Sequence, residues 1–154
     1  MTRRTTQEHL VYEQLLLTRY ALQGTKSAVR PTELDRSATV LLARLEASGP
    51  LSVGELAEAF GLDISTVHRQ VAAAMKSGLV ERIDDPDGGA ARKHRPTPEG
   101  TRMLHEELDA RVDTFASVTA DWSEEELDVF TAGLRRLNEG IEKLRSAPWP
   151  RPEH

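Results

Sequence analysis

A run of polar side chains between residues 65 and 70 offers the donors and acceptors that recognition of nucleic acid requires. Hydroxyl, imidazole, guanidinium and amide groups can bond base edges and phosphate oxygens. The apolar residues around them recur at helical spacing, which predicts a helix with Ile64, Val67, Val71 and Met75 pointing inward. The outward set consists of Ser65, Thr66, His68, Arg69 and Gln70. An ordinary solvated helix face has the same pattern, so the neighbouring elements must decide between the two interpretations.

The neighbouring segments predict a helix-turn-helix followed by a β-wing. Ser52 and Glu55 have the capping-box spacing of a short helix, and Gly61 permits a tight turn before the expected N-cap, Asp63. Strands are expected at 79–84 and 91–95, with a turn at 85–89 between them. A helix-turn-helix with such a wing favours DNA binding, with the second helix in the major groove.

Longer helices flank this unit and carry more apolar surface than one chain can bury. The last helix begins at the capping pair Ser123 and Glu126, and its apolar residues alternate in steps of three and four. A heptad-like seam of this kind is typical of helix pairing, so we expect it to form a dimer interface. The seam consists of Leu127, Phe130, Leu134, Leu137, Ile141 and Leu144. The other flanking helices are expected at about 7–29, 35–46 and 97–118.

The expected fold is therefore mainly α, with a winged helix-turn-helix, a small β-wing, and terminal helices that form a dimerisation region. The DNA-binding region is expected at 35–97, and the dimerisation helices at 1–34 and 98–146. The proline-rich segment 147–154 is expected to be a flexible tail.

Charge and composition narrow the function further. The chain has 154 residues, with 20 basic and 25 acidic side chains and a net charge of −5. Twelve acidic and seven basic side chains fall in 101–154, whereas 63–100 carries six of each, so the expected DNA-binding region is not itself acidic. The absence of cysteine excludes disulfides, thiolate zinc sites and thiol-based redox sensing. Without a signal peptide or an apolar run of roughly 20 residues, a cytoplasmic protein with no membrane contact is expected.

The residues that enzymes and metal sites need are poorly represented. The chain has no phosphate-binding glycine motif, and His105-Glu106-Glu107 lacks the second histidine of a zinc-protease helix. The five histidines show no metal-ligand spacing. We therefore expect no enzymatic activity, no cofactor and no metal.

From about Leu10 to Leu144 the sequence resembles the MarR family of bacterial transcriptional regulators. The resemblance implies a winged-helix homodimer whose first and last helices form the interface. It also implies binding to palindromic promoter DNA, with release by a small ligand in many members, and favours a repressor. The segments that carry it, in order, are Gly49-Pro50-Leu51-Ser52-Val53-Gly54-Glu55-Leu56-Ala57, Gly61-Leu62-Asp63-Ile64-Ser65-Thr66-Val67-His68-Arg69, Gly78-Leu79-Val80-Glu81-Arg82, Asp85-Pro86-Asp87 and Thr97-Pro98-Glu99-Gly100.

The wing departs from the family pattern. Many relatives carry an Asp and a minor-groove Arg directly after the Asp-Pro-Asp turn, where this chain has Gly88, Gly89 and Ala90. Its basic residues come later, as Arg92, Lys93, His94 and Arg95. We expect Arg92, Lys93 and Arg95 to serve the wing. Because neighbouring residues of a strand point to opposite faces, Lys93 and Arg95 share one face, which we expect to look toward DNA.

The first helix offers a site for a small aromatic or lipophilic effector, at Tyr12, Leu16 and Tyr20. A role of the same side chains in the dimer core is the competing interpretation. Two other functions remain open on the sequence alone. One is a dimeric protein-binding adaptor that has lost affinity for DNA, and the other is a small-molecule sensor or enzyme that uses the cavity between the dimer helices and the winged domain.

Overall fold

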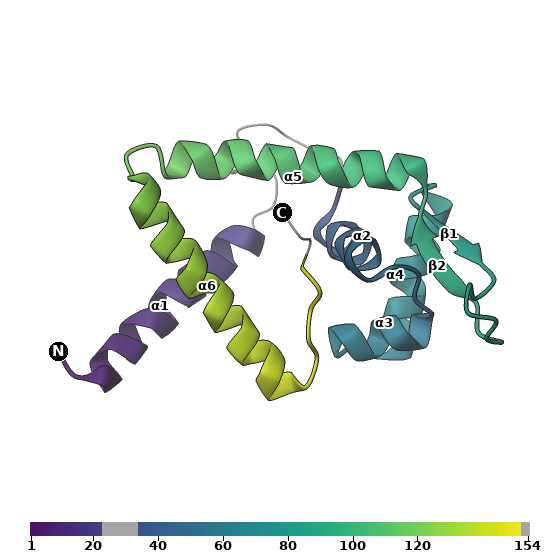
Figure 1. Cartoon of the computed structure of the whole chain (residues 1–154), viewed down its shortest axis with the longest axis horizontal. Helices are drawn as coiled ribbons and strands as arrows, with labels where there is room; N and C mark the ends of the chain where they lie inside the picture. The colour runs from purple at the N-terminus through teal and green to yellow at the C-terminus, as the bar shows by residue number, and fades with distance from the viewer. Residues whose placement is uncertain (23–33, 152–154) are drawn as a thin grey trace.

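The wing and the short helices gather at one end of a long helix, and the terminal helices lie toward the other end (Figure 1). The computed structural model describes residues 1–22 and 34–151. Its elements are α1 (Arg3–Leu22), α2 (Arg36–Ser48), α3 (Val53–Phe60), α4 (Ile64–Lys76), β1 (Val80–Ile83), β2 (Lys93–Pro96), α5 (Pro98–Val118) and α6 (Glu124–Arg145). The predicted mainly helical, winged helix-turn-helix fold is confirmed.

Local capping signals account for most of the helix starts. The Asp35 carboxylate accepts a hydrogen bond from the backbone N–H of Ala38 at 2.8 Å, which begins α2. Complete capping boxes begin α3 at Ser52 and α6 at Ser123. Asp63 occupies the N-cap position of α4 as expected, but its side chain makes no capping hydrogen bond. The start of α4 therefore has no side-chain cap, and the burial of this helix begins at Val67.

One apolar core joins α2, α3 and α4 to the sheet and to the first half of α5. Its most deeply buried side chains are Leu41, Leu42, Leu45, Leu56, Val67 and Leu104. The first turn of α5 lies directly against β1, because a Cβ on Gly100 would lie only 2.0 Å from the carbonyl oxygen of Leu79. This close approach requires glycine and fixes where α5 leaves the winged core.

The wing is an antiparallel pair of strands with a short third edge. In the register of β1 and β2, Arg82 lies opposite His94 and Glu81 lies opposite Arg95. Leu51, just before α3, exchanges two backbone hydrogen bonds with His94, at 2.7 and 3.2 Å. The wing is thus attached to the start of the helix-turn-helix and does not project freely.

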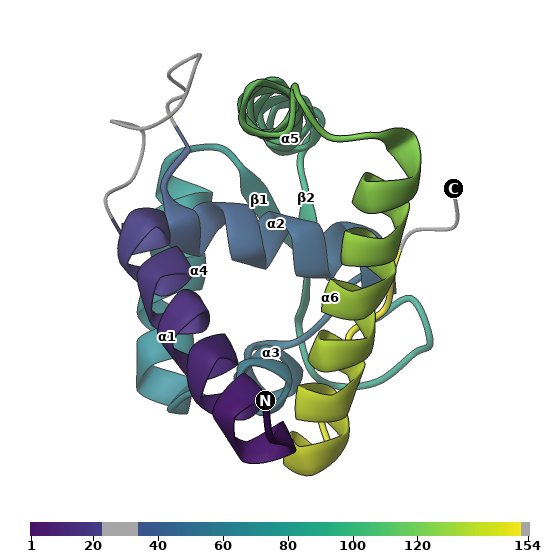
Figure 2. The same cartoon turned by 90° about the vertical axis from the view of Figure 1, so that its left-hand side faces the viewer.

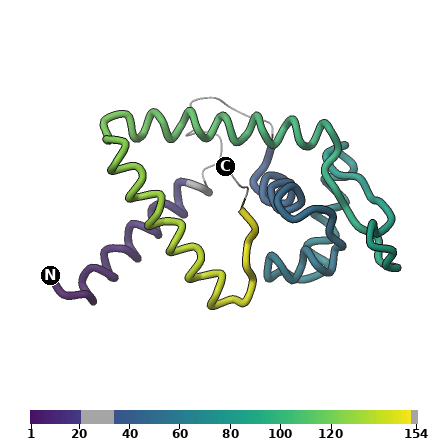
Figure 3. The backbone as a smooth tube through the Cα atoms, in the orientation of Figure 1, coloured from purple at the N-terminus to yellow at the C-terminus, as the bar shows by residue number. Residues whose placement is uncertain are grey.

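The terminal helices α1 and α6 lie on the same side of the winged core, nearest the viewer in Figure 2 and to its left in Figure 3. No residue of α6 is buried, and all six seam residues are exposed, Leu134 and Leu137 by 38% and Leu144 by 88%. On α1, Leu10, Leu15 and Tyr20 are exposed as well. In the part of the chain that the structure describes, neither helix packs extensively against the winged core. No helix in these ranges is long and apolar enough to cross a membrane.

Two expectations at the ends of the chain differ from the structure. The first helix begins at Arg3, four residues before the expected start, and its expected end near 29 lies outside the described residues. The expected flexible tail has defined contacts as far as Arg151, where Trp149 stacks on Phe60 and Arg151 pairs with Glu142. The expectation of flexibility rested on the proline content and the terminal position of the tail. The contacts of residues 147–151 instead involve Phe60, which is distant in the sequence, and Glu142.

Candidate nucleic-acid interface

Helix α4 has one buried face and one outer face. Its buried side chains are Val67, Val71 and Ala74, which face the core. The expectation that Ile64 and Met75 also point inward is wrong, since Ile64 is 65% exposed and Met75 is exposed too. The reason is that they lie at the two ends of the helix, beyond the residues that α2 and α3 cover. Ile64, which sequence periodicity assigned to the core, therefore adds an apolar group to the outer face.

The polar residues predicted for recognition lie away from the core. Ser65, His68 and Arg69 are exposed, and Thr66 and Gln70 are half-buried. The Arg69 guanidinium donates to the Thr66 hydroxyl at 3.3 Å and makes no ion pair with any residue in the described ranges. Its positive charge is thus available to an anion outside the chain.

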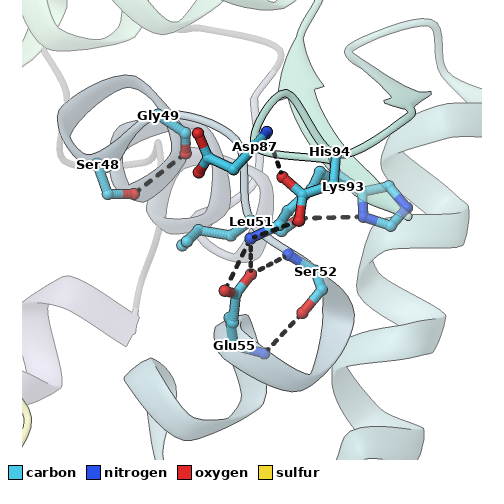
Figure 4. Close-up of polar contacts among 9 residues, drawn as sticks. Ser48, Gly49, Leu51, Ser52, Glu55, Asp87, Lys93 and His94 are labelled. Atoms are coloured by element: carbon cyan, nitrogen blue, oxygen red, sulfur yellow. Dashed lines mark hydrogen bonds and ion pairs between the residues drawn. The ribbon is translucent and has the colours of Figure 1, made fainter. Parts of the chain in front are cut away.

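Lys93 is tied to α3 instead of pointing into solvent. Its ammonium lies 2.8 Å from both carboxylate oxygens of Glu55 and 4.0 Å from the carboxylate of Asp85, and its side chain is 13% exposed (Figure 4). The same Glu55 carboxylate accepts a hydrogen bond from the Ser52 backbone N–H at 2.7 Å. Lys93, followed by the Ser52 N–H, lowers the pKa of Glu55, and the bond to Glu55 raises the pKa of Lys93. One carboxylate therefore both caps α3 and anchors the wing.

The other predicted wing cations also have acidic partners. Arg95 pairs with Glu81 across the two strands at 2.7 Å, and Arg92 pairs with Asp84. Both arginines remain more than half exposed, so a phosphate could still approach them. Any such contact would compete with a carboxylate already in place, which reduces its contribution to DNA affinity.

His94 points to the opposite face from Lys93 and Arg95, as strand alternation predicts. It is 5% exposed, and its Nδ1 lies 3.3 Å from the Leu51 carbonyl oxygen. Burial lowers the pKa of His94, the Leu51 carbonyl partly opposes that shift, and electrostatic interactions with Arg82 and His68 lower the pKa further. The imidazole is therefore neutral at pH 7 and supplies no charge to the wing.

Arg82 is a wing cation that sequence reasoning missed. It is exposed, lies opposite His94, and has no ion pair within the described residues. Because residues paired across antiparallel strands point to the same side of the sheet, Arg82 lies on the same face of the wing as His94. The signal was available in the sequence, because Arg82 and Glu81 must point to opposite faces of β1, and only Glu81 can meet a cross-strand cation.

The described residues contain no group of three or more His, Asp or Glu side chains placed to hold a metal ion. His105, which precedes Glu106 in the sequence, places its Nε2 2.7 Å from the Glu46 carboxylate of α2. This contact joins α5 to α2 and is structural.

Comparison with known proteins agrees with this geometry. A sequence model of the MarR family matches residues 32–91, which cover the helix-turn-helix, β1 and the wing turn. The chain is 34% identical over 134 residues to the uncharacterized HTH-type transcriptional regulator YxaD of Bacillus subtilis (strain 168), covering 87% of this chain and 94% of YxaD. The chain belongs to the MarR family. It is a DNA-binding transcriptional regulator.

Solved structures of MarR proteins share the fold. A MarR family protein from Bacillus stearothermophilus has a TM-score of 0.76 and 27% identity, with 92% of this chain and 98% of that chain covered. The PcaV transcriptional regulator from Streptomyces coelicolor, solved in complex with its natural ligand, has a TM-score of 0.63 and 24% identity, with the same coverage. The winged core and both terminal helices are therefore features of the MarR fold.

The ion pairs of the wing lead to a test that separates structural cations from DNA-binding ones. Arg82→Ala should weaken binding to every duplex and reduce the slope of log affinity against log salt by about one, with the melting temperature unchanged. Lys93→Ala should lower the melting temperature, because Glu55 loses its partner, and should leave the salt slope unchanged. Salt titrations by fluorescence anisotropy and thermal melts measure both quantities. The reverse ranking would identify Lys93 as the phosphate ligand, as strand alternation alone suggested.

Proposed function

We propose that the chain acts in the cytoplasm as a homodimeric repressor that binds a palindromic promoter site. The observation that carries this proposal is the outer face of α4, where polar side chains and an unpaired arginine stand over a wholly buried inner face. In this proposal 35–97 binds DNA, and 1–34 and 98–146 form the dimerisation region. Selection of bound duplexes from a random pool tests it, since a twofold-related pair of half-sites is the expected product. Capture of a protein partner with no selected DNA would favour the adaptor alternative.

The dimer follows from apolar surface that one chain leaves in water. The α6 seam and the exposed leucines and tyrosines of α1 together form a larger apolar surface than a monomer ordinarily exposes. The 3–4 spacing of the seam suits knobs-into-holes packing against another helix. A second copy of the chain, which presents the same seam, is the partner that a twofold arrangement requires.

Leu137→Glu tests this interface. The substitution would place an unpaired carboxylate in the buried seam, at a cost of several kcal/mol, so light scattering should report a monomer or an aggregate. Val129→Glu is the matched control, because Val129 lies on α6 outside the seam and is 68% exposed. The control should remain dimeric. A folded, dimeric Leu137→Glu protein would contradict the assignment of the seam.

In the proposed complex the outer face of α4 lies in the major groove. Ser65, Thr66, His68 and Gln70 reach base edges and phosphates, and Arg69 makes either a bidentate contact to guanine or a phosphate contact. Ile64, exposed at the first turn, suits contact with a thymine methyl group. On the wing, we propose Arg82 as the main cation, with Arg92 and Arg95 secondary and Lys93 committed to Glu55.

Arg69→Ala distinguishes base reading from phosphate contact. If Arg69 reads a base, the substitution should cost about 1–3 kcal/mol on the selected site and relax the preference at one position. If it contacts phosphate, the loss should be uniform across sequences and the salt slope should fall by about one. Lys76→Ala, at the C-terminal end of the same helix, is the control and should change neither. Unaltered binding of Arg69→Ala would move the contact surface away from α4.

We also propose regulation by a small aromatic or lipophilic effector, as PcaV binds a natural ligand. The proposed contacts are Tyr12, Leu16 and Tyr20 on α1, of which both tyrosines are more than half exposed in one chain, so a second copy would have to complete the site. Phenolic and lipophilic compounds should raise the melting temperature and weaken DNA binding, and Tyr12→Ala should abolish both effects. If no compound changes either quantity, α1 serves the dimer core alone.

A further inference from the structure

The segment that follows α6, which we term the C-terminal strap (residues 147–151), turns back along α6 and is bound to a single carboxylate of that helix. Glu142 accepts hydrogen bonds from the Trp149 backbone N–H at 3.2 Å and from the Arg151 guanidinium at 3.1 Å. The bond from Arg151, followed by that from the Trp149 N–H, lowers the pKa of Glu142. A backbone bond from the Ala147 N–H to the Glu142 carbonyl, at 3.0 Å, fixes the turn itself.

The side chain of Trp149 reaches from α6 to the helix-turn-helix. Its ring stacks on Phe60, the last residue of α3, with centroids 5.9 Å apart and planes 21° apart. The Arg44 guanidinium of α2 lies 5.1 Å from the centre of the Trp149 ring and donates to the Pro148 carbonyl at 3.0 Å. The strap therefore contacts both helices against which α4 packs.

Arg44 shows how closely the strap fits. Its Nε is buried without a hydrogen-bond partner, and burial lowers the pKa of the guanidinium. No carboxylate among the described residues pairs with this cation, so the Trp149 ring and the Pro148 carbonyl provide its stabilising contacts. Pro148 and Pro150 on either side of Trp149 restrict the free chain, which lowers the entropic cost of holding the strap in place.

The strap forms a second connection between α6 and the winged core. At one end α5 runs from the wing to the turn that begins α6, and at the other end the strap runs from α6 back toward α2 and α3 (Figure 1). The strap thus adds a second connection between α6 and the winged core, besides the one through α5 and the 119–123 turn, among the residues that the structure describes. A single connection would let α6 rotate relative to the winged core, whereas two connections hold the angle between them.

We propose that the C-terminal strap fixes the recognition helix relative to α6, so that Trp149, Arg44 and Glu142 are positioning residues for the recognition of paired half-sites. This inference rests on the proposed dimeric DNA binding, in which α6 lies at the twofold axis. Two half-sites must lie about 34 Å apart on one face of the duplex, and each added base pair changes both their distance and their rotation. A strap that holds α4 at one angle to α6 therefore selects one spacing.

The test measures affinity for duplexes whose two half-sites are separated by the selected spacing or by one or two base pairs more or fewer. Wild-type protein should prefer one spacing. Trp149→Ala should lose roughly three- to tenfold at that spacing and show a flatter dependence on spacing, with unchanged affinity for a single half-site. Trp149→Phe keeps an aromatic ring over Phe60 and should restore much of the preference. Single half-site affinity is the readout that a general loss of folding would also reduce.

Fluorescence reports the docked strap directly. In a Trp122→Phe background Trp149 is the sole tryptophan, and Arg151→Ala should raise its quenching by acrylamide and shift its emission to the red. Arg145→Ala is the matched control, because it removes a cation at the same end of α6 that pairs with no described residue, and it should change neither signal.

Each departure from these results has a definite meaning. A Trp149→Ala spacing profile that superimposes on the wild-type profile overturns the positioning role and leaves the dimeric regulator intact. A monomeric Trp149→Ala protein also overturns it, because the strap would then act on assembly. A wild-type protein with no spacing preference overturns both proposals.

Discussion

Burial of one face of α4 is the constraint on which the other functional features depend. A recognition helix can present side chains in a fixed pattern only if its opposite face is held, and Val67, Val71 and Ala74 provide that attachment to α2 and α3. The side chain of the N-cap residue Asp63 adds no hydrogen bond to it. Because the packing of these three apolar side chains contributes to the rotation of the helix, larger or smaller residues there would shift the polar face without altering any polar residue.

The distribution of charge follows from a second requirement, that the wing stay attached to the helix-turn-helix. Lys93 and Glu55 link β2 to the capping box of α3, and Leu51 links the same strand through its backbone. These contacts stabilise the wing but occupy a cation that sequence reasoning assigned to DNA. The positive charge left to the interface comes from Arg69 and Arg82, which lie on neighbouring elements and have no acidic partner among the described residues. A chain with a net charge of −5 can thus still place unpaired positive charge at one surface, because its acidic residues are concentrated in 101–154.

The parts of the fold that depend on neighbours in the sequence could be predicted from it. Capping boxes at Ser52 and Ser123, the left-handed turn at Gly61 and the heptad spacing of α6 all rest on residues within a few positions of one another. The wing contacts could not be predicted in this way, because Lys93 and Glu55 are 38 positions apart and many acidic residues were equally eligible. The helical periodicity wrongly assigned Ile64 to the core for a similar reason. Periodicity shows which residues share a helix face, but it does not show how far along the helix other elements cover that face.

The apolar residues of the winged core and those of α6 differ in where they are buried. Many of those in α2, α3 and α4 are fully buried within one chain, as Leu42 and Val67 show, whereas no residue of α6 is buried. Both sets follow helical spacing, so only the lack of an intramolecular partner distinguishes them. The terminal helices therefore carry apolar surface that the winged core does not cover, and a second surface is needed to bury it. The contacts of Trp149 with Phe60 and Arg44 connect these two sets of residues. Through them the orientation of α6, whose apolar seam needs a second copy to be buried, is linked to α2 and α3, the helices that hold α4.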